Sequence, residues 1–108
     1  MFKLELEYKN CILFARLKGI LNRKNSYKIN NYLNPVIKKH NIKYLVYNFE
    51  MIDNSGIDAI KNSKYFVKCN KGVVKVCGVC GAQEYLCKYL KLVKVKSEID
   101  ACMEMEVM

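Results

Sequence analysis

The sequence predicts an α/β fold, with a mixed sheet of four to five strands, an N-terminal hairpin and about four helices. Two apolar, alternating segments come before any helical pattern, and extended and helical segments then alternate to the end of the chain. Alternation of this kind favours right-handed crossovers between parallel strands. The length of 108 residues suits one domain, and no linker or repeat interrupts residues 1–108, so we expect a single domain.

The first two strands are predicted over residues 3–8 and 11–17. Both segments are rich in apolar residues, and the first alternates them with Lys and Glu. Lys9 and Asn10 separate the two strands and favour a turn. We therefore expect an antiparallel hairpin that is followed by Lys18-Gly19.

The first helix is expected to begin at Asn25 or Ser26, both of which are suitable N-cap residues. Pro35 falls within its apolar stripe and cannot donate a backbone hydrogen bond. Either the helix bends at Pro35, or Asn34 caps a second short helix that has Pro35 at its first position. The stripe consists of Ile29, Tyr32, Leu33, Val36 and Ile37, at helical spacing.

The rest of the chain alternates strand and helix. The Ser97 hydroxyl, with Asp100 three residues later, is expected to cap the last helix. One face of the third helix would carry Ala82, Tyr85, Leu86 and Tyr89, and the last helix would bear Ile99, Cys102 and Met103. The predicted segments are a strand over 44–49, a helix over 55–68, a strand over 73–77, a helix over 81–89, a short strand over 92–95 and a helix after Ser97.

The composition excludes some classes of protein and leaves others open. Hydrophobic residues make up 52%, too many for a disordered chain. No apolar run reaches the roughly 18 residues of a membrane-spanning helix, and the first residues do not resemble a signal peptide. We therefore expect a cytoplasmic protein whose six cysteines are mostly reduced and buried.

The chain is strongly basic, with a formal net charge of +9 at pH 7. The last twelve residues contain four acids and no Lys or Arg, so residues 1–96 hold 19 basic and six acidic residues, for +13. Such a charge favours an acidic partner surface or a nucleic acid. The lysines are scattered along the chain, however, and a solvated lysine surface is the alternative interpretation.

The central segment places Ser55 at the start of a helix. Asp53-Asn54-Ser55-Gly56 directly follows the apolar run that ends at Ile52. The first N–H groups of a helix lack internal partners and favour anions, including a phosphate on the serine itself. Alternatively, Ser55 only caps the helix, as half of a capping box with Asp58.

The chain resembles a STAS domain of the anti-sigma factor antagonist family. In that family, a strand leads into Asp-Ser-Ser-Gly or Asp-x-Ser-Gly at the start of the second helix, as residues 47–56 do here. Residues 17–22 resemble the family's Leu-x-Gly-x-Leu-Asp segment, and the likeness continues over residues 71–79, Leu86 and Leu92-Val93.

This resemblance implies a regulatory switch and not an enzyme. A serine kinase that is also an anti-sigma factor would phosphorylate Ser55, a phosphatase would reverse the reaction, and no cofactor would be needed. Asn22 stands where the family often has Asp, and Asp58 replaces a small residue and would repel a phosphate on Ser55. The residues expected to contact the partner are Asn22, Asn25, Asp53, Asn54, Gly56 and Asp58.

Other functions are compared with the regulatory switch on the basis of their motifs. A STAS-like scaffold without phosphorylation is the first alternative, and Cys77 and Cys80 form a CxxC that suits thiol–disulfide exchange. One CxxC with Cys87 and the single His40 is a poor zinc set. Ser55 lacks the preceding elbow glycine of a hydrolase, and no motif that reads nucleic acid is present.

Overall fold

The computed structural model of the chain describes residues 2–49, 51–52, 56–79 and 83–105. The elements, in chain order, are β1 (Lys3–Lys9), β2 (Ile12–Lys18), β3 (Ile20–Leu21), the π-helix η1 (Ile29–Leu33), α1 (Asn34–Lys39), β4 (Tyr44–Asn48), β5 (Met51–Ile52), α2 (Ile57–Cys69), β6 (Val73–Cys77), α3 (Gln83–Leu90), β7 (Val93–Lys94) and α4 (Glu98–Met105).

The main sheet has five strands in the order β1-β2-β4-β6-β7. β1 pairs antiparallel with β2, and the three other pairings are parallel. The predicted mixed sheet with an N-terminal hairpin is therefore confirmed. Asn10 and Cys11 form the hairpin turn with φ of 54° and 66°, as a two-residue turn with both central residues in the left-handed region requires.

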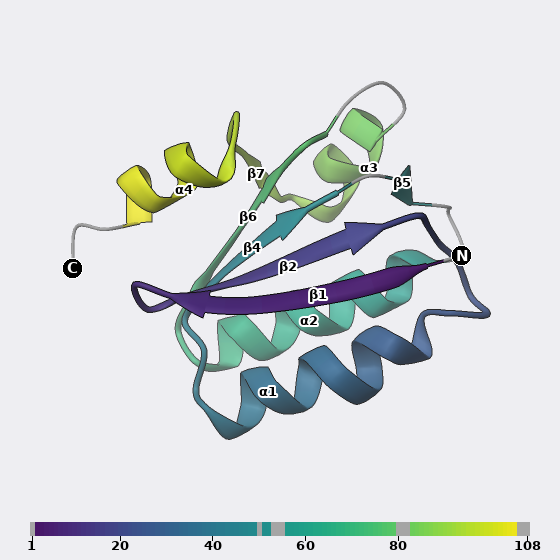
Figure 1. Ribbon diagram of the computed structural model, residues 1–108, viewed down its shortest axis with the longest axis horizontal. Coiled ribbons are helices and arrows are strands. Elements are labelled where there is room, and N and C mark those ends of the chain that lie inside the picture. Colours follow the sequence, from purple (N-terminus) through teal and green to yellow (C-terminus); the bar gives the residue numbers. More distant parts are fainter. Residues whose placement is uncertain (1, 50, 53–55, 80–82, 106–108) are drawn as a thin grey trace.

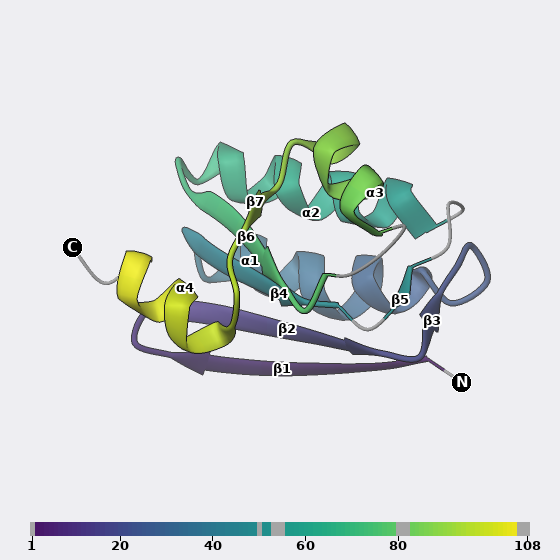
Figure 2. The same cartoon turned by 90° about the horizontal axis from the view of Figure 1, so that it is seen from above.

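Helices cover the two faces of the sheet unequally. η1, α1 and α2 lie on one face with α3 beside α2, and α4 lies alone on the other face (Figures 1 and 2). β2 is buried on both faces, because Leu13 and Leu17 point into the larger core and Ile12 and Phe14 pack beneath α4. Burial on both faces explains why this strand is apolar almost throughout its length.

Pro35 is accommodated by a wide helical turn. The N–H of Asn34 donates to the carbonyl of Ile29, five residues earlier, and Pro35 then lies in the first turn of α1. Asn34 has helical dihedral angles, φ −61° and ψ −40°, so it does not cap a separate helix. Its buried side chain instead accepts a hydrogen bond from Ser63 on α2 at 2.6 Å.

Three tyrosines predicted in apolar helix stripes are exposed. Tyr32 is 60% exposed, Tyr85 72% and Tyr89 58%. Among the side chains of α3 whose burial is described, Cys87 and Leu90 are buried. The predicted packing of these tyrosines was wrong because a tyrosine can lie along a surface with its hydroxyl in water.

The last helix begins as predicted but packs through a different stripe. The N–H of Asp100 donates to the Ser97 hydroxyl at 3.2 Å, which confirms the cap. Ala101 and Met105 are buried against the sheet, whereas Ile99 and Met103 are 73% and 68% exposed. α4 bears the expected residues, but it packs on the sheet through Ala101 and Met105 and not through Ile99 or Met103.

Candidate functional site

The short pair of strands β3 and β5 brings two distant segments together. Ile20 pairs with Met51 and Leu21 with Ile52, in parallel. β3 leads into the loop at residues 22–25, and Gly56, directly before α2, lies against Leu21 at the end of β3. We call the loop and the first turn of α2 the candidate interface.

The two asparagines of the loop hold each other in place. The N–H of Asn22 donates to Oδ1 of Asn25 at 2.8 Å, and the N–H of Asn25 donates to Oδ1 of Asn22 at 3.1 Å. Nδ2 of Asn25 also donates to the carbonyl of Ile20 at 2.7 Å. Both side chains therefore have a structural role in shaping this loop.

Gly56 fixes the start of α2 against this loop. It is buried, and a Cβ added there would lie 2.9 Å from both Cγ and the carbonyl oxygen of Leu21. A larger residue would push the helix away from β3, which explains the glycine at this position.

Only part of the predicted site can be placed. Asn22, Asn25, Gly56 and Asp58 lie within the described residues, with Asp58 exposed in the first turn of α2. A carboxylate in the first turn interacts favourably with the helix dipole. The predicted residues Asp53, Asn54 and Ser55 lie outside the described residues, as does the capping box of Ser55 with Asp58.

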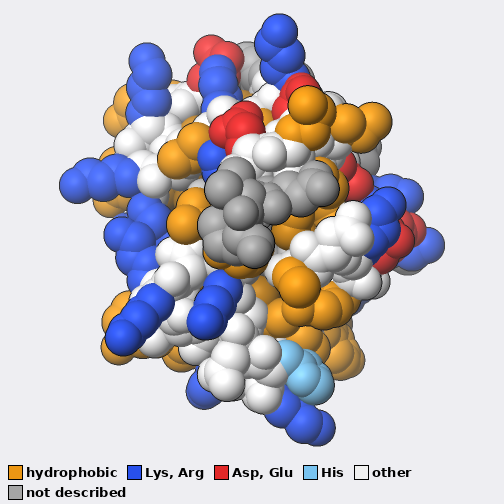
Figure 3. Space-filling model, turned by 90° about the vertical axis from the view of Figure 1, so that its left-hand side faces the viewer, with side chains coloured by type: hydrophobic (Ala, Val, Ile, Leu, Met, Phe, Trp, Pro, Cys, Tyr) orange, Lys and Arg blue, Asp and Glu red, His pale blue; other side chains and the backbone are white. Residues whose placement is uncertain are grey.

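Basic side chains are numerous on the described surface. Figure 3 shows one end of the molecule, where Lys and Arg side chains project around much of the rim with a few acidic residues among them. Arg23 and Lys24 are exposed in the loop of the candidate interface. An acidic partner would therefore meet favourable charges there.

The burial of Cys77 argues against a function in thiol–disulfide exchange. This side chain is buried beneath α4, and burial, with a smaller effect from the charge of Glu98, raises the pKa of its thiol to about 11. A thiol with so high a pKa is protonated at neutral pH and is a poor nucleophile. Its predicted partner, Cys80, lies outside the described residues.

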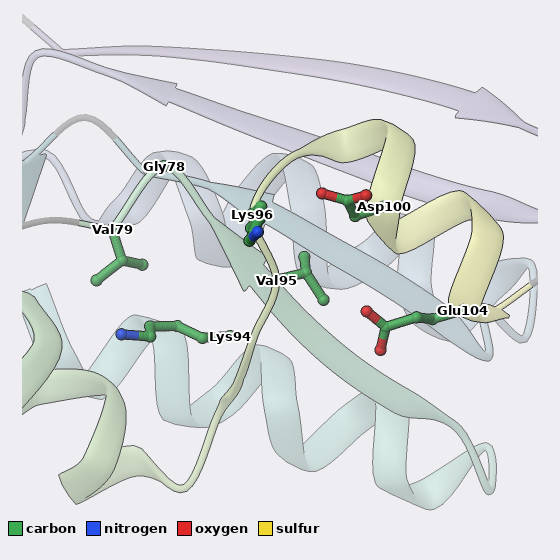
Figure 4. Close-up of a pocket in the computed structure, with 7 residues that line it drawn as sticks. All are labelled: Gly78, Val79, Lys94, Val95, Lys96, Asp100 and Glu104. Carbon is green, nitrogen blue, oxygen red and sulfur yellow. The ribbon is translucent and has the colours of Figure 1, made fainter.

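A hollow of about 570 Å³ lies between β7 and α4 (Figure 4). Two of its charged groups are already paired, since Lys94 contacts Glu84 at 2.6 Å and Glu104 contacts Lys75 at 2.8 Å. The charged groups of the hollow without a described ion pair are Lys96 and Asp100, which have opposite charges. Its lining residues are Gly78, Val79, Lys94, Val95, Lys96, Asp100 and Glu104.

The described residues contain no group of three or more His, Cys, Asp and Glu side chains suited to a metal ion. His40 is exposed at the end of α1, beside an apolar hollow of about 400 Å³. No helix in the described part of the chain is both long and apolar enough to cross a bilayer.

A polar network beneath α4 was missed by the sequence analysis. Arg16 on β2 binds Glu98 at the start of α4 through two contacts and binds Glu7 on β1 at 2.8 Å. Nδ2 of Asn48 donates to the same Glu98 carboxylate at 2.9 Å. The one available signal was an arginine within an otherwise apolar strand.

Two solved structures share this architecture. No protein-family model matches the chain. The unphosphorylated form of the anti-sigma factor antagonist SpoIIAA superposes with a TM-score of 0.76 at 14% identity, over 96% of each chain. The phosphorylated form of SpoIIAA, described as a Bacillus cell fate determinant, superposes with a TM-score of 0.75 at 16% identity, over 96% of this chain and 97% of that chain. The chain therefore has the STAS fold that SpoIIAA has in both its unphosphorylated and its phosphorylated form.

Proposed function

We propose that this chain is an anti-sigma factor antagonist-like switch that binds a serine kinase acting as an anti-sigma factor. In this proposal the candidate interface contacts the kinase, and a phosphatase restores the unmodified form. The role is regulatory and not catalytic. The observation that carries it is the β3–β5 pairing, which joins the Asn22–Asn25 loop to the start of α2 in a fold shared with SpoIIAA.

The proposed point of control is a phosphate on Ser55. A phosphate adds a charge of about −1.5 to −2 and three acceptor oxygens, enough to disrupt a protein interface by repulsion and desolvation. The dipole at the start of α2 would favour it, whereas Asp58 in the first turn would oppose it. Asp53 and Asn54 would contact the kinase or order the segment around Ser55.

The test is a phosphorylation assay with the serine kinases encoded in the same genome. The protein is incubated with each purified kinase and ATP, and its intact mass is measured. We expect the addition of one phosphate, which Ser55→Ala abolishes. Ser26→Ala is the matched control and should leave the modification unchanged.

The unphosphorylated scaffold gives a different result in the same assay. If no kinase modifies the protein but one binds it with ATP and without, the phosphorylation switch is wrong and the scaffold is correct. If no candidate kinase modifies or binds the protein, the proposed partner is wrong as well.

A further inference from the structure

Three exposed tyrosines lie on the adjoining surfaces of α2 and α3. Tyr65 is 63% exposed, Tyr85 72% and Tyr89 58%. Figure 2 shows both helices on the same side of the sheet, and two side chains of α2 reach α3, because Nζ of Lys61 contacts the Tyr89 hydroxyl and Nζ of Lys64 contacts the carbonyl of Leu90. We call this surface the tyrosine–lysine face; it comprises Lys61, Lys64, Tyr65, Lys68, Tyr85, Lys88, Tyr89 and Lys91.

The tyrosine–lysine face is held in place by contacts between the two helices. Nζ of Lys61 lies 4.9 Å from the centre of the Tyr89 ring and 3.5 Å from its hydroxyl oxygen. Nζ of Lys64 donates to the carbonyls of Leu90 at 2.6 Å and Lys91 at 3.1 Å, where α3 ends. Side chains that are already ordered lose less conformational entropy when a partner binds.

The described part of the chain gives the lysines of this face no ion-pair partner, and the charge of Glu84 acts on Lys88 only from beyond ion-pair distance. No described carboxylate lies within 4 Å of its five lysines. The neighbouring cations of Lys68 and Lys91 add to the effect of burial in lowering the pKa of Lys64. The described glutamates are paired elsewhere, Glu5 with Lys3 and Lys18, Glu7 and Glu98 with Arg16, Glu84 with Lys94, and Glu104 with Lys75.

We propose that the tyrosine–lysine face binds an acidic surface on a protein partner. The proposal rests on the proposed function for the identity of that partner, the anti-sigma factor kinase. Asp58, Lys61 and Tyr65 follow one another at helical spacing on the exposed side of α2, so this stripe joins the candidate interface to the tyrosine–lysine face. Tyrosines are enriched at the cores of protein interfaces, and the lysines would attract the acidic surface from their edge.

A protein suits this surface better than a single-stranded nucleic acid does. Proteins that bind single strands without sequence preference use a basic groove that follows the backbone, with aromatic rings for the bases. Here the tyrosines lie on the outer sides of two helices, and the three main hollows of the described residues are lined by other parts of the chain. Nζ of Lys61 also lies over the ring of Tyr89, where a base would otherwise stack.

The test measures binding of each candidate kinase to the full chain and to its variants by isothermal titration calorimetry at several salt concentrations. Lys61→Glu and Tyr85→Ala, both at exposed positions, are each expected to weaken binding about tenfold or more. Lys96→Glu has the same change in charge as Lys61→Glu but lies beside α4, and it should leave the affinity unchanged. Added salt should weaken wild-type binding more steeply than Lys61→Glu binding.

Each other outcome overturns the proposal. If the kinase binds and the two face variants match the wild type, the tyrosine–lysine face is not used, although the proposed function stands. If no kinase binds the wild type, the proposed function fails and this partner fails with it. If a single-stranded RNA oligonucleotide binds and Tyr85→Ala and Lys61→Glu abolish that binding, the face recognises nucleic acid instead.

Discussion

Arg16 on β2 and Glu98 at the start of α4 form a two-point ion pair across 82 residues of sequence. Nε of Arg16 lies 2.9 Å from Oε2 of Glu98, and Nη2 lies 2.8 Å from Oε1. Paired contacts of this geometry are stronger than single ones, and both side chains are largely shielded from solvent. This pair therefore fixes the beginning of α4 over the second face of the sheet.

Glu98→Gln is expected to lower the free energy of unfolding by about 1–3 kcal/mol near neutral pH. Hydrogen bonds from Arg16 hold the pKa of the Glu98 carboxyl below its usual value, with a smaller contribution from Asn48. A carboxylate whose pKa falls on folding stabilises the protein above its unfolded pKa of about 4.3. That stability is lost as the pH drops through the lower pKa of the folded state.

The measurement is urea unfolding of the wild type and Glu98→Gln at neutral pH and below about pH 4. The difference between them should shrink at the acidic pH. Glu5→Gln is the control, because the Glu5 pair with Lys18 is exposed and should matter little. An equal loss for the two variants would contradict the role given to the Arg16–Glu98 pair.

Asn25→Asp should disturb the candidate interface, whereas Asn22→Asp should be tolerated. Within the described part of the chain, the Asn22 side chain accepts one hydrogen bond through its amide oxygen, and a carboxylate can accept the same bond. Asn25 uses both ends of its amide, and its Nδ2 donates to the carbonyl of Ile20. An aspartate there would place a carboxylate against that carbonyl and lose the bond.

We expect Asn25→Asp to cost about 1–3 kcal/mol of stability and Asn22→Asp less than about 0.5 kcal/mol. Thermal unfolding of both variants under the same conditions measures the difference. Asn22→Asp also restores the residue that STAS domains of the anti-sigma factor antagonist family often have. Equal losses from the two substitutions would show that the bond to Ile20 contributes nothing.

The strands of the main sheet were predictable because a buried strand has a run of apolar residues in its local sequence. β6 was predicted with its observed bounds, Val73–Cys77, since four of its five residues are apolar and three of these are buried. The Ser97 cap was predictable for a similar reason, because Ser97 and Asp100 are only three residues apart.

The orientation of the last helices was not predictable from periodicity. On α4 the pair Ala101 and Met105 and the pair Ile99 and Met103 have the same four-residue spacing. Only the position of the helix over Phe14 decides which pair is buried. That position depends in turn on the Arg16–Glu98 contact, which no local pattern reveals.

The candidate site was predicted in part. Turn-forming residues after an apolar run predicted a helix from about Ser55, and α2 begins at Ile57 with Gly56 directly before it. Only the resemblance to a family indicated that the Asn22–Asn25 loop lies beside the start of α2. The strands β3 and β5, which bring the two together, have two residues each. Strands of that length leave no alternating pattern in a sequence.

Tyr47→Phe is expected to raise the free energy of unfolding by about 1 kcal/mol. The Tyr47 side chain is fully buried in the larger core, and its hydroxyl makes no well-formed hydrogen bond with the described residues, although the nearby Ser63 hydroxyl partly offsets the effect of burial on its pKa. Burial also raises the pKa of this phenol, so it stays neutral. Removing an unpartnered buried hydroxyl relieves a desolvation cost while the ring keeps its packing.

Urea unfolding of Tyr47→Phe measures this gain. Tyr32→Phe serves as the control, since the Tyr32 side chain is 60% exposed and its hydroxyl can bond to water. A clear loss of stability in Tyr47→Phe, with none in Tyr32→Phe, would mean that the buried hydroxyl does have a partner.

Cys77 is expected to resist alkylation near neutral pH, whereas Cys69 reacts. Cys69 is exposed at the end of α2, and Cys77 is buried beneath α4 with a pKa raised to about 11. Because the thiolate is the reactive form, both burial and the high pKa protect Cys77. Brief treatment with iodoacetamide, followed by peptide mass spectrometry, should therefore modify Cys69 and leave Cys77 free.

In Glu98→Gln the start of α4 loses a contact, so Cys77 should react faster there than in the wild type. Rapid modification of Cys77 in the wild type would restore the thiol–disulfide alternative and contradict the packing of α4 described above.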